Sequence, residues 1–308
     1  MNSVNVIETT SLGKRYGRFW ALRECTFAIP EGHLAALVGP NGAGKTTLLH
    51  LSVGLTNATA GTATVLGGQP AGSRAALDGI AFVAQDTPVY TSLTGANMIR
   101  VARNLNRSFD PAYAHARLAE LGIPLDRKAA RLSGGQRAQL ALTLALARRP
   151  RLLVLDEPLA SLDPLARHDF MGTVLAAMGE DGVSVLLSSH VLAELERVAD
   201  FLVLLTRGQV RVADDVEGLL AGHRVLTGPT AGADRLGEHL DVVQDQRAEA
   251  QAHLLVKTRG PDDPVPPGWE AHPVSMEELV LAYLRGEAGD MPLDSVPGQP
   301  ADRMGAAR

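Results

Sequence analysis

The sequence predicts an α/β fold built on a largely parallel sheet. From residue 4 to about residue 222, strand-like segments alternate with helical patterns, as in strand–helix–strand units. Three apolar runs, at residues 34–38, 152–155 and 183–187, have the length of strands that are buried on both faces. A glycine-rich segment follows the first run directly and marks a turn into a helix. In open sheets of this kind, ligands bind at the carboxyl ends of the strands.

The composition excludes several classes of protein. The chain has 308 residues, of which 45% are hydrophobic and 20% charged, so it can bury a sizeable core and does not resemble a disordered chain. Its 29 basic and 34 acidic residues leave a net charge of −5, which gives no overall attraction to nucleic acid. Cys25 is the single cysteine, so an intrachain disulfide and a cysteine-based zinc cluster are excluded. We expect one or two globular domains and no nucleic-acid partner.

Neither a membrane-spanning segment nor a targeting signal is expected. The longest apolar runs are strand-sized and end in polar residues, whereas a spanning helix needs roughly 18 or more apolar residues. The N-terminus has no basic region leading into an apolar segment, which argues against a signal peptide. A lone thiol agrees with a cytoplasmic protein.

A helical insertion interrupts the alternating pattern. Residues 87–131 show apolar positions at helical spacing, most clearly at residues 112–121. This segment lies between two predicted sheet elements, so we expect a helical subdomain inside a domain that covers residues 4–222.

The residue pattern of the sequence changes after about residue 222. A turn is predicted at residues 227–230 and a strand at residues 252–257. Ser275 and Glu278 have the spacing of a capping box in front of an apolar run, which predicts a final helix. We expect a small α+β accessory unit at residues 223–285. The tail at residues 286–308 is rich in Gly, Pro, Asp and Ala and is expected to be flexible.

The glycine-rich segment has the pattern G-x-x-x-x-G-K-[ST]. It follows the predicted strand at residues 34–38 and precedes an apolar helical run, which is the context the motif requires. Curled backbone N–H groups and the helix N-terminus would hold a triphosphate, with Lys45 near the β- and γ-phosphates and the Thr46 hydroxyl on Mg²⁺. A chance glycine-rich turn is the alternative. The predicted nucleotide-binding residues of this loop are Gly39, Pro40, Asn41, Gly42, Ala43, Gly44, Lys45, Thr46 and Thr47.

Two adjacent acids end the predicted strand at residues 152–155. Asp156 is placed to hold Mg²⁺, directly or through water, and Glu157 to orient the water that attacks the γ-phosphate. The alternative is a strand that ends in a solvated acidic turn. The presence of Lys45 in the same chain favours the catalytic interpretation.

The segment Leu132-Ser133-Gly134-Gly135-Gln136 resembles the signature of ATP-binding cassette (ABC) ATPases. Four further residues match that family in order along the chain. Tyr16 resembles the aromatic that stacks on adenine, and Gln85 the glutamine that reaches Mg²⁺ and the attacking water. Asp163 resembles the acid of the loop that crosses the dimer interface, and His190 the histidine that contacts the γ-phosphate. The resemblance covers about residues 4–222.

This resemblance implies a P-loop NTPase fold of the ABC-ATPase type that binds ATP and Mg²⁺. It assigns the catalytic residues as Lys45, Gln85, Glu157 and His190, and the metal ligands as Thr46, Gln85 and Asp156. In the family, the equivalents of Ser133, Gly135 and Gln136 belong to the signature that meets the γ-phosphate held on a facing subunit. Since the chain has one copy of each motif, the resemblance implies a head-to-tail dimer with itself or with a related cassette.

Several of these residues have ordinary structural interpretations when taken alone. Tyr16 would be a half-exposed aromatic, His190 a surface or packing histidine, and Ser133-Gly134-Gly135 a turn or a helix start. Gln85 alone indicates nothing. Their order and spacing favour the functional interpretation.

The family resemblance leaves the cellular role open between several hypotheses. The first is the energy-coupling subunit of a transporter at the cytoplasmic face of the membrane, docked on a separate permease near Gln85 and residues 87–97. The short N-terminal lead and the small C-terminal unit resemble single-cassette subunits of antibiotic and multidrug exporters more than sugar importers. Alternatives are a non-transport ABC ATPase acting on ribosomes or DNA, and a cassette that has lost hydrolysis. Residues 223–285 are either a packing or dimerisation appendage or a regulatory or permease-contacting unit.

Overall fold

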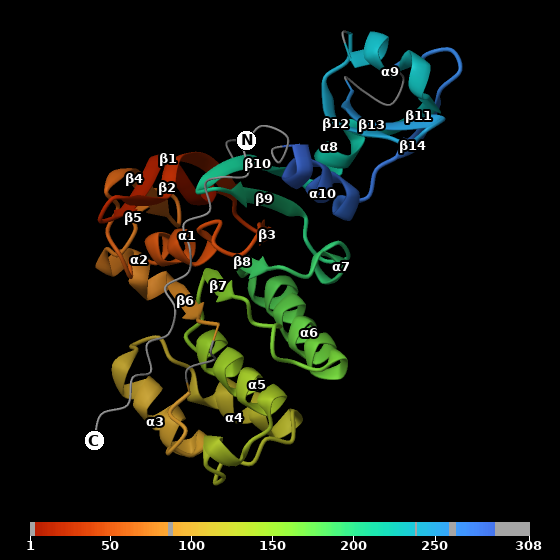
Figure 1. The fold of residues 1–308 in the computed structure, drawn as a ribbon. Helices are drawn as coiled ribbons and strands as arrows, with labels where there is room; N and C mark the ends of the chain where they lie inside the picture. The colour runs from red at the N-terminus through yellow and green to blue at the C-terminus, as the bar shows by residue number, and fades with distance from the viewer. Residues whose placement is uncertain (1–3, 86–88, 238, 259–262, 287–308) are drawn as a thin grey trace, which may run out of the picture.

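The structure is a computed structural model that describes residues 4–85, 89–237, 239–258 and 263–286. Residues 87 and 88 of the predicted helical insertion lie outside this part, as does the predicted tail from residue 287 onward. The described residues form three sheets with helices around them (Figure 1).

The central sheet has six strands in the order β10-β9-β3-β8-β7-β6. Five of them are parallel, and β10 is antiparallel to β9. This confirms the largely parallel sheet and the three buried strands that the sequence predicts. The strands are β3 (Leu34–Val38), β6 (Ile80–Val83), β7 (Leu152–Asp156), β8 (Ser184–Ser189), β9 (Phe201–Thr206) and β10 (Gln209–Asp215).

Both faces of the central sheet are buried because successive side chains point to opposite sides. In β3, Leu34 and Ala36 pack into the core that contains α5 and α6, whereas Ala35 and Leu37 pack into the core that contains α1. These helices are α1 (Lys45–Ser52), α5 (Gly134–Leu146) and α6 (Pro164–Asp181). Because β3, β6, β7 and β8 are parallel, their carboxyl ends share one edge of this sheet, which the packing on both faces makes rigid.

An antiparallel sheet lies on the other side of α1, in the order β2-β1-β4-β5 (Figure 1). The alternating strand and helix pattern of this region does not predict a second sheet. The long strands β1 and β2 form a hairpin, and β4 joins it from beyond α1. The strands are β1 (Asn5–Tyr16), β2 (Phe19–Pro30), β4 (Ala60–Val65) and β5 (Gln69–Pro70).

A helical region with its own core follows β6. It packs Met98 and Ile99 of α3 against Ala114 and Leu118 of α4 and against Leu140 of α5. The elements are α3 (Gly95–Leu105), α4 (Pro111–Glu120) and the short η1 (Ala129–Arg131), while α2 (Arg74–Gly79) precedes β6. Helices α3 and α4 lie within the predicted insertion, whose bounds as a subdomain stay a prediction.

The third sheet has the order β12-β13-β11-β14 and is covered on both faces. One face packs with α9 and the other with α10. The elements are β11 (His223–Pro229), α9 (Thr230–Gly237), β12 (Val242–Arg247), β13 (Gln251–Lys257), β14 (Glu270–Pro273) and α10 (Met276–Gly286), after α7 (Leu192–Leu195) and α8 (Val216–Ala221). The final helix begins where the capping box places it, since Ser275 Oγ accepts from the Glu278 N–H at 3.2 Å. The division at residue 222 stays a prediction.

The turn predicted at residues 227–230 is wrong. Thr227, Gly228 and Pro229 continue β11 and pair with β13, and α9 begins at Thr230. The Trp269 ring lies against Gly228 of β11. A Cβ at residue 228 would be 2.3 Å from the ring, which explains a glycine inside the strand. Pro229 is tolerated because it ends the strand, beyond the last residue that pairs with β14.

Candidate nucleotide site

The glycine-rich loop joins β3 to α1, as the motif requires. Gly44 precedes the first residue of α1 and has φ +107°, in the left-handed region that favours glycine. A Cβ at Gly44 would also be 2.6 Å from the carbonyl oxygen of Ala21. The loop therefore needs glycine here for both its backbone conformation and its close approach to β2.

Lys45 is the first residue of α1, and its ammonium group is buried. Its Nζ donates to the carbonyl oxygen of Gly39 at 2.8 Å and lies 3.4 Å from Glu157 Oε1. Only 7% and 9% of the two side chains are exposed. The loop cation and the strand-end acid thus meet as a buried ion pair.

Glu157 also contacts His190, the histidine predicted to contact the γ-phosphate. Its Oε2 lies 2.5 Å from His190 Nδ1, and the His190 side chain is 53% exposed. The backbone of Glu157 has φ +48°, a conformation that costs a non-glycine residue about 1–3 kcal/mol and that clusters at functional sites. The strained, buried Glu157 therefore joins Lys45 to His190.

Ser188 fixes both acids, and the sequence analysis gave it no role. Its Oγ accepts from the backbone N–H of Glu157 at 2.8 Å and donates to Asp156 Oδ1 at 2.7 Å. The serine is fully buried at the end of β8, directly opposite Asp156 in the parallel register. The only signal in the sequence was a polar residue at the end of an apolar strand.

A pocket of about 570 Å³ lies over the loop and gathers most of the predicted site residues. Its lining residues are Tyr16, Phe19, Ala21, Pro40, Asn41, Gly42, Gly44, Lys45, Thr46, Thr47, Gln85, Glu157 and His190. Gly39, Ala43 and Asp156 are buried and are not among the lining residues. The pocket has the size of a site for a small organic ligand.

Two aromatic side chains stand at one end of this pocket. Tyr16 ends β1 and Phe19 begins β2, and the two residues pair across the hairpin. Their exposed fractions are 51% and 66%, and Lys14 Nζ lies 5.2 Å from the centre of the Tyr16 ring. Phe19 is a pocket residue that sequence reasoning missed, because its position depends on the hairpin register.

The remaining predicted residues line a separate pocket of about 200 Å³, which includes Ser133, Gly135, Gln136 and Asp163. Three of them cap helices: Ser133 and Gln136 form a capping box at α5, and Asp163 Oδ1 accepts from the Ala166 N–H at the start of α6. None of the four lines the pocket that contains Lys45. One chain therefore presents two separate halves of the predicted site.

The donor set near the loop suits a hard cation held together with a phosphate. Thr46 offers a hydroxyl, Gln85 an amide oxygen and Asp156 a carboxylate, and Mg²⁺ is usually held by one or two such groups with waters and phosphate oxygens. No cluster of three His, Cys, Asp or Glu side chains suited to a metal occurs among the residues that the structure describes. The residues fit a nucleotide-borne Mg²⁺ better than an all-protein metal site.

Comparison with known proteins identifies the family. A family model described as ABC transporter matches residues 22–160. The chain is 30% identical over 214 residues to the lantibiotic transport ATP-binding protein SrtF of Streptococcus pyogenes, which covers 69% of this chain and 92% of SrtF. The chain belongs to the ABC transporter family. It is an ATP-binding cassette of the P-loop NTPase fold, and it is an ATPase.

Other ABC proteins similar to this cassette differ in length and in role. The sulfate/thiosulfate import ATP-binding protein CysA of Bordetella bronchiseptica is 36% identical, over 66% of this chain and 60% of CysA. The ABC transporter ATP-binding protein YtrB of Bacillus subtilis is 29% identical, over 92% of this chain and 99% of YtrB. A crystal structure of a nucleotide-free ABC transporter cassette superposes with a TM-score of 0.63 at 25% identity, covering 70% of this chain and 94% of that one.

Proposed function

We propose that this cassette is the energy-coupling subunit of an ABC exporter, where it hydrolyses ATP and drives a separate membrane permease. The observation that carries this proposal is the junction at β6. Phe82 and Val83 line an apolar groove, and Gln85, two residues further on, lines the nucleotide pocket. A partner bound in the groove would contact β6, and Gln85, two residues after β6, reaches the nucleotide pocket.

In this proposal, the chain's own side chains prepare the phosphates for attack. The loop N–H groups and Lys45 hold the β- and γ-phosphates, and Tyr16 stacks on the base. Glu157 orients the attacking water, while His190 contacts the γ-phosphate and holds the Glu157 carboxylate in place. When bound, Mg²⁺ would neutralise charge on the phosphate oxygens, with Thr46, Gln85 and Asp156 as its protein ligands.

The working unit in this proposal contains two cassettes. The pocket with Lys45 and the pocket with Ser133 lie apart in one chain. A two-fold, head-to-tail pair would bring the Ser133 half of one copy to the Lys45 half of the other, at two equivalent sites. ATP would then close the pair, and hydrolysis would release it.

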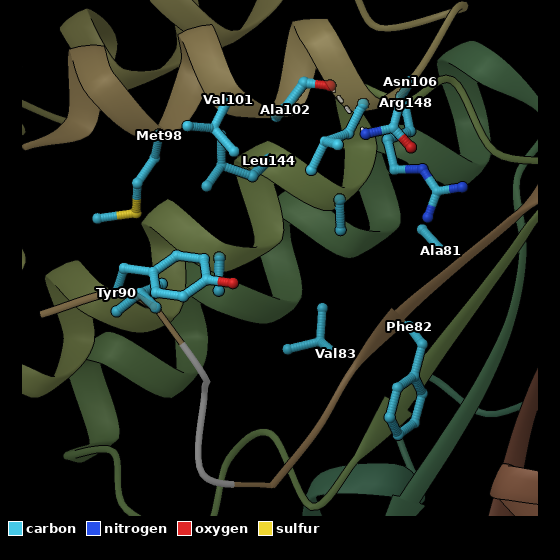
Figure 2. A pocket seen from close by; sticks show the side chains of 14 residues that line it. Ala81, Phe82, Val83, Tyr90, Met98, Val101, Ala102, Asn106, Leu144 and Arg148 are labelled. Carbon is cyan, nitrogen blue, oxygen red and sulfur yellow. Dashed lines mark hydrogen bonds between the residues drawn. The ribbon is translucent and has the colours of Figure 1, made fainter. Parts of the chain in front are cut away.

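The apolar groove is the proposed docking site for the permease (Figure 2). Its volume is about 260 Å³, and side chains of β6, α3 and α5 line it. Tyr90 and Leu105 on its rim are 70% and 77% exposed. No helix in the part of the chain that the structure describes has the length and apolar character needed to span a bilayer. In this proposal, the permease attaches the cassette to the cytoplasmic face of the membrane.

Several observations support export as the direction. The match to SrtF covers 92% of that lantibiotic transport protein, whereas the match to the import protein CysA covers 60% of it. The match to YtrB extends over 92% of this chain, so the C-terminal unit is part of that similarity. SrtF and CysA match similar shares of this chain, 69% and 66%, so the support for export rests on the share of each relative's own length that is matched.

The docking proposal is tested by charging the groove. Leu105→Asp places a carboxylate on the exposed rim of the groove, where it must be desolvated when an apolar partner docks. We expect this variant to lose sedimentation with membranes from cells that contain the permease, while the purified chain keeps its ATP turnover. The matched control is Leu175→Asp, since Leu175 is 40% exposed on α6 and lines neither the groove nor either half of the nucleotide site. Equal membrane recovery of both variants would contradict the proposal.

A further inference from the structure

Helix α10 belongs to two hydrophobic cores at once. Met276 and Val280, one turn apart, are buried in the core of the central sheet. Leu279 and Ala282 point the other way and pack against the third sheet with Leu255. Figure 1 shows α10, in blue, between the third sheet and the end of the central sheet. A movement of the third sheet can therefore be transmitted to the central sheet through α10.

The first turn of α10 is attached to the cassette by a charged hydrogen bond. The backbone N–H of Met276 donates to Glu196 Oε1 at 3.1 Å. A carboxylate at this position satisfies a free N–H group and complements the positive end of the helix. Glu196 directly follows α7, so the start of α10 is tied to the end of α7.

Helix α7 in turn begins two residues after His190. Its buried Leu195 packs in the same core as Met276 and Val280. On its other side, Glu194 Oε1 accepts from Arg167 of α6 at 2.6 Å. The four-residue helix α7 is thus held between α6 and α10, and it is the first regular element after the histidine that contacts Glu157.

We propose that Glu196 is a positioning residue for hydrolysis: through its bond to α10 it fixes α7, and α7 holds His190 against Glu157. The accessory sheet then controls turnover through α10, without contact with the nucleotide. This inference rests on the proposed catalytic roles of Glu157 and His190. It assigns residues 223–285 to the control of the hydrolysis site.

The test compares three variants in the full chain. Glu196→Ala removes the acceptor at the start of α10, and Glu196→Gln keeps an oxygen that can accept the same bond. Glu278→Ala is the matched control, because Glu278 Oε2 accepts from Ser275 within α10's own capping box and has no bond to α7. Glu196 is exposed, so we expect all three variants to fold and to show parental circular dichroism.

We expect Glu196→Ala to lower kcat about 3-fold to 10-fold with an unchanged KM for ATP, because the phosphate loop is untouched. Glu196→Gln should restore most of the rate, and Glu278→Ala should keep it. Hydrogen exchange should accelerate in α7 of Glu196→Ala alone. A parental kcat with unchanged exchange in α7, or an equal loss in all three variants, would overturn the inference. Glu157→Gln, measured alongside, reports on the proposed catalytic site: parental turnover there would contradict the site, independently of Glu196.

Discussion

The contact between Lys45 and Glu157 is costly for stability at the scale of single residues. Both side chains are buried, and desolvation of two charges offsets much of their attraction. The left-handed backbone of Glu157 adds a further cost. Hydrophobic residues of similar size would stabilise the fold as well or better. The pair is therefore better explained by chemistry at the phosphates than by stability.

Replacement of each partner in this pair should separate ATP binding from hydrolysis. Glu157→Gln removes the negative charge that competes with phosphate for Lys45, so we expect ATP binding to be kept or strengthened and turnover to fall at least about 100-fold. ATP should then trap a dimer that size-exclusion chromatography detects. Lys45→Ala removes the buried cation of the pocket, and we expect titration calorimetry to show no ATP binding.

Each variant of the pair serves as the control for the other. Parental turnover in Glu157→Gln would contradict its role at the attacking water. Unchanged ATP affinity in Lys45→Ala would contradict the role of the loop. A loss of ATP binding in both variants would indicate that the pocket itself has been disturbed.

Motif residues of the site were predictable, and their supporting residues were not. Lys45 and Glu157 follow from patterns whose chemistry requires those residue types, and His190 follows from the family resemblance. Phe19 reaches the pocket because it pairs with Tyr16, and Ser188 reaches both acids because it lies opposite Asp156. Strand register decides both placements, and a single sequence carries little information on register.

At the scale of elements, His223 joins three of them. Its Nδ1 lies 2.7 Å from the carbonyl oxygen of Leu219 in α8, and its Nε2 lies 3.0 Å from the Tyr283 hydroxyl in α10. The histidine itself begins β11. Burial lowers the pKa of His223 below the ordinary histidine value, and nearby Lys257 acts in the same direction. The neutral ring is the form that accepts a hydrogen bond from Tyr283.

These contacts of His223 predict that the free energy of unfolding decreases in mild acid. Because the pKa of His223 is lower in the folded protein than in the unfolded chain, the unfolded chain binds more protons just below about pH 6.5. The contribution of His223 to the free energy of unfolding is complete above that pH. It is lost as the pH falls through the lowered pKa of His223. Between about pH 7.5 and pH 5.5, urea unfolding should show a larger loss for the parental protein than for His223→Gln. Equal losses would contradict this role, since other titrating groups are common to both proteins.

Elements with strong local signals were predicted, and those set by distant contacts were not. Patterns of adjacent residues predict the buried strands β3, β7 and β8 and the capping box of α10. The antiparallel sheet needs β4 to pair with β1 across more than forty intervening residues, about which local patterns say nothing. Gly228 and Pro229 have the local signal of a turn, and packing of Trp269 against β11 overrides it.

At the scale of the whole molecule, three surfaces would have to act together. The Lys45 pocket, the Ser133 pocket and the apolar groove are built from different elements of the chain. Gln85 lines the first pocket and closely follows β6, whose side chains line the groove, and α10 links the third sheet to the end of α7. In the proposed function, the chain would respond to two partners at these surfaces, a second cassette and a permease.

The separation of the two pockets allows a complementation test of the head-to-tail dimer. Lys45→Ala disables one half of the site, and Ser133→Asp disables the other by bringing a negative charge toward the γ-phosphate, while Asp still caps α5. Each variant alone forms dimers with no intact site. A mixed dimer pairs the intact Lys45 half of one copy with the intact Ser133 half of the other, so it has one complete site. Since half of the dimers in an equal mixture are mixed, we expect about a quarter of the parental ATP turnover. A mixture no more active than the separate variants would contradict the shared site, because it would mean that each chain completes its site alone.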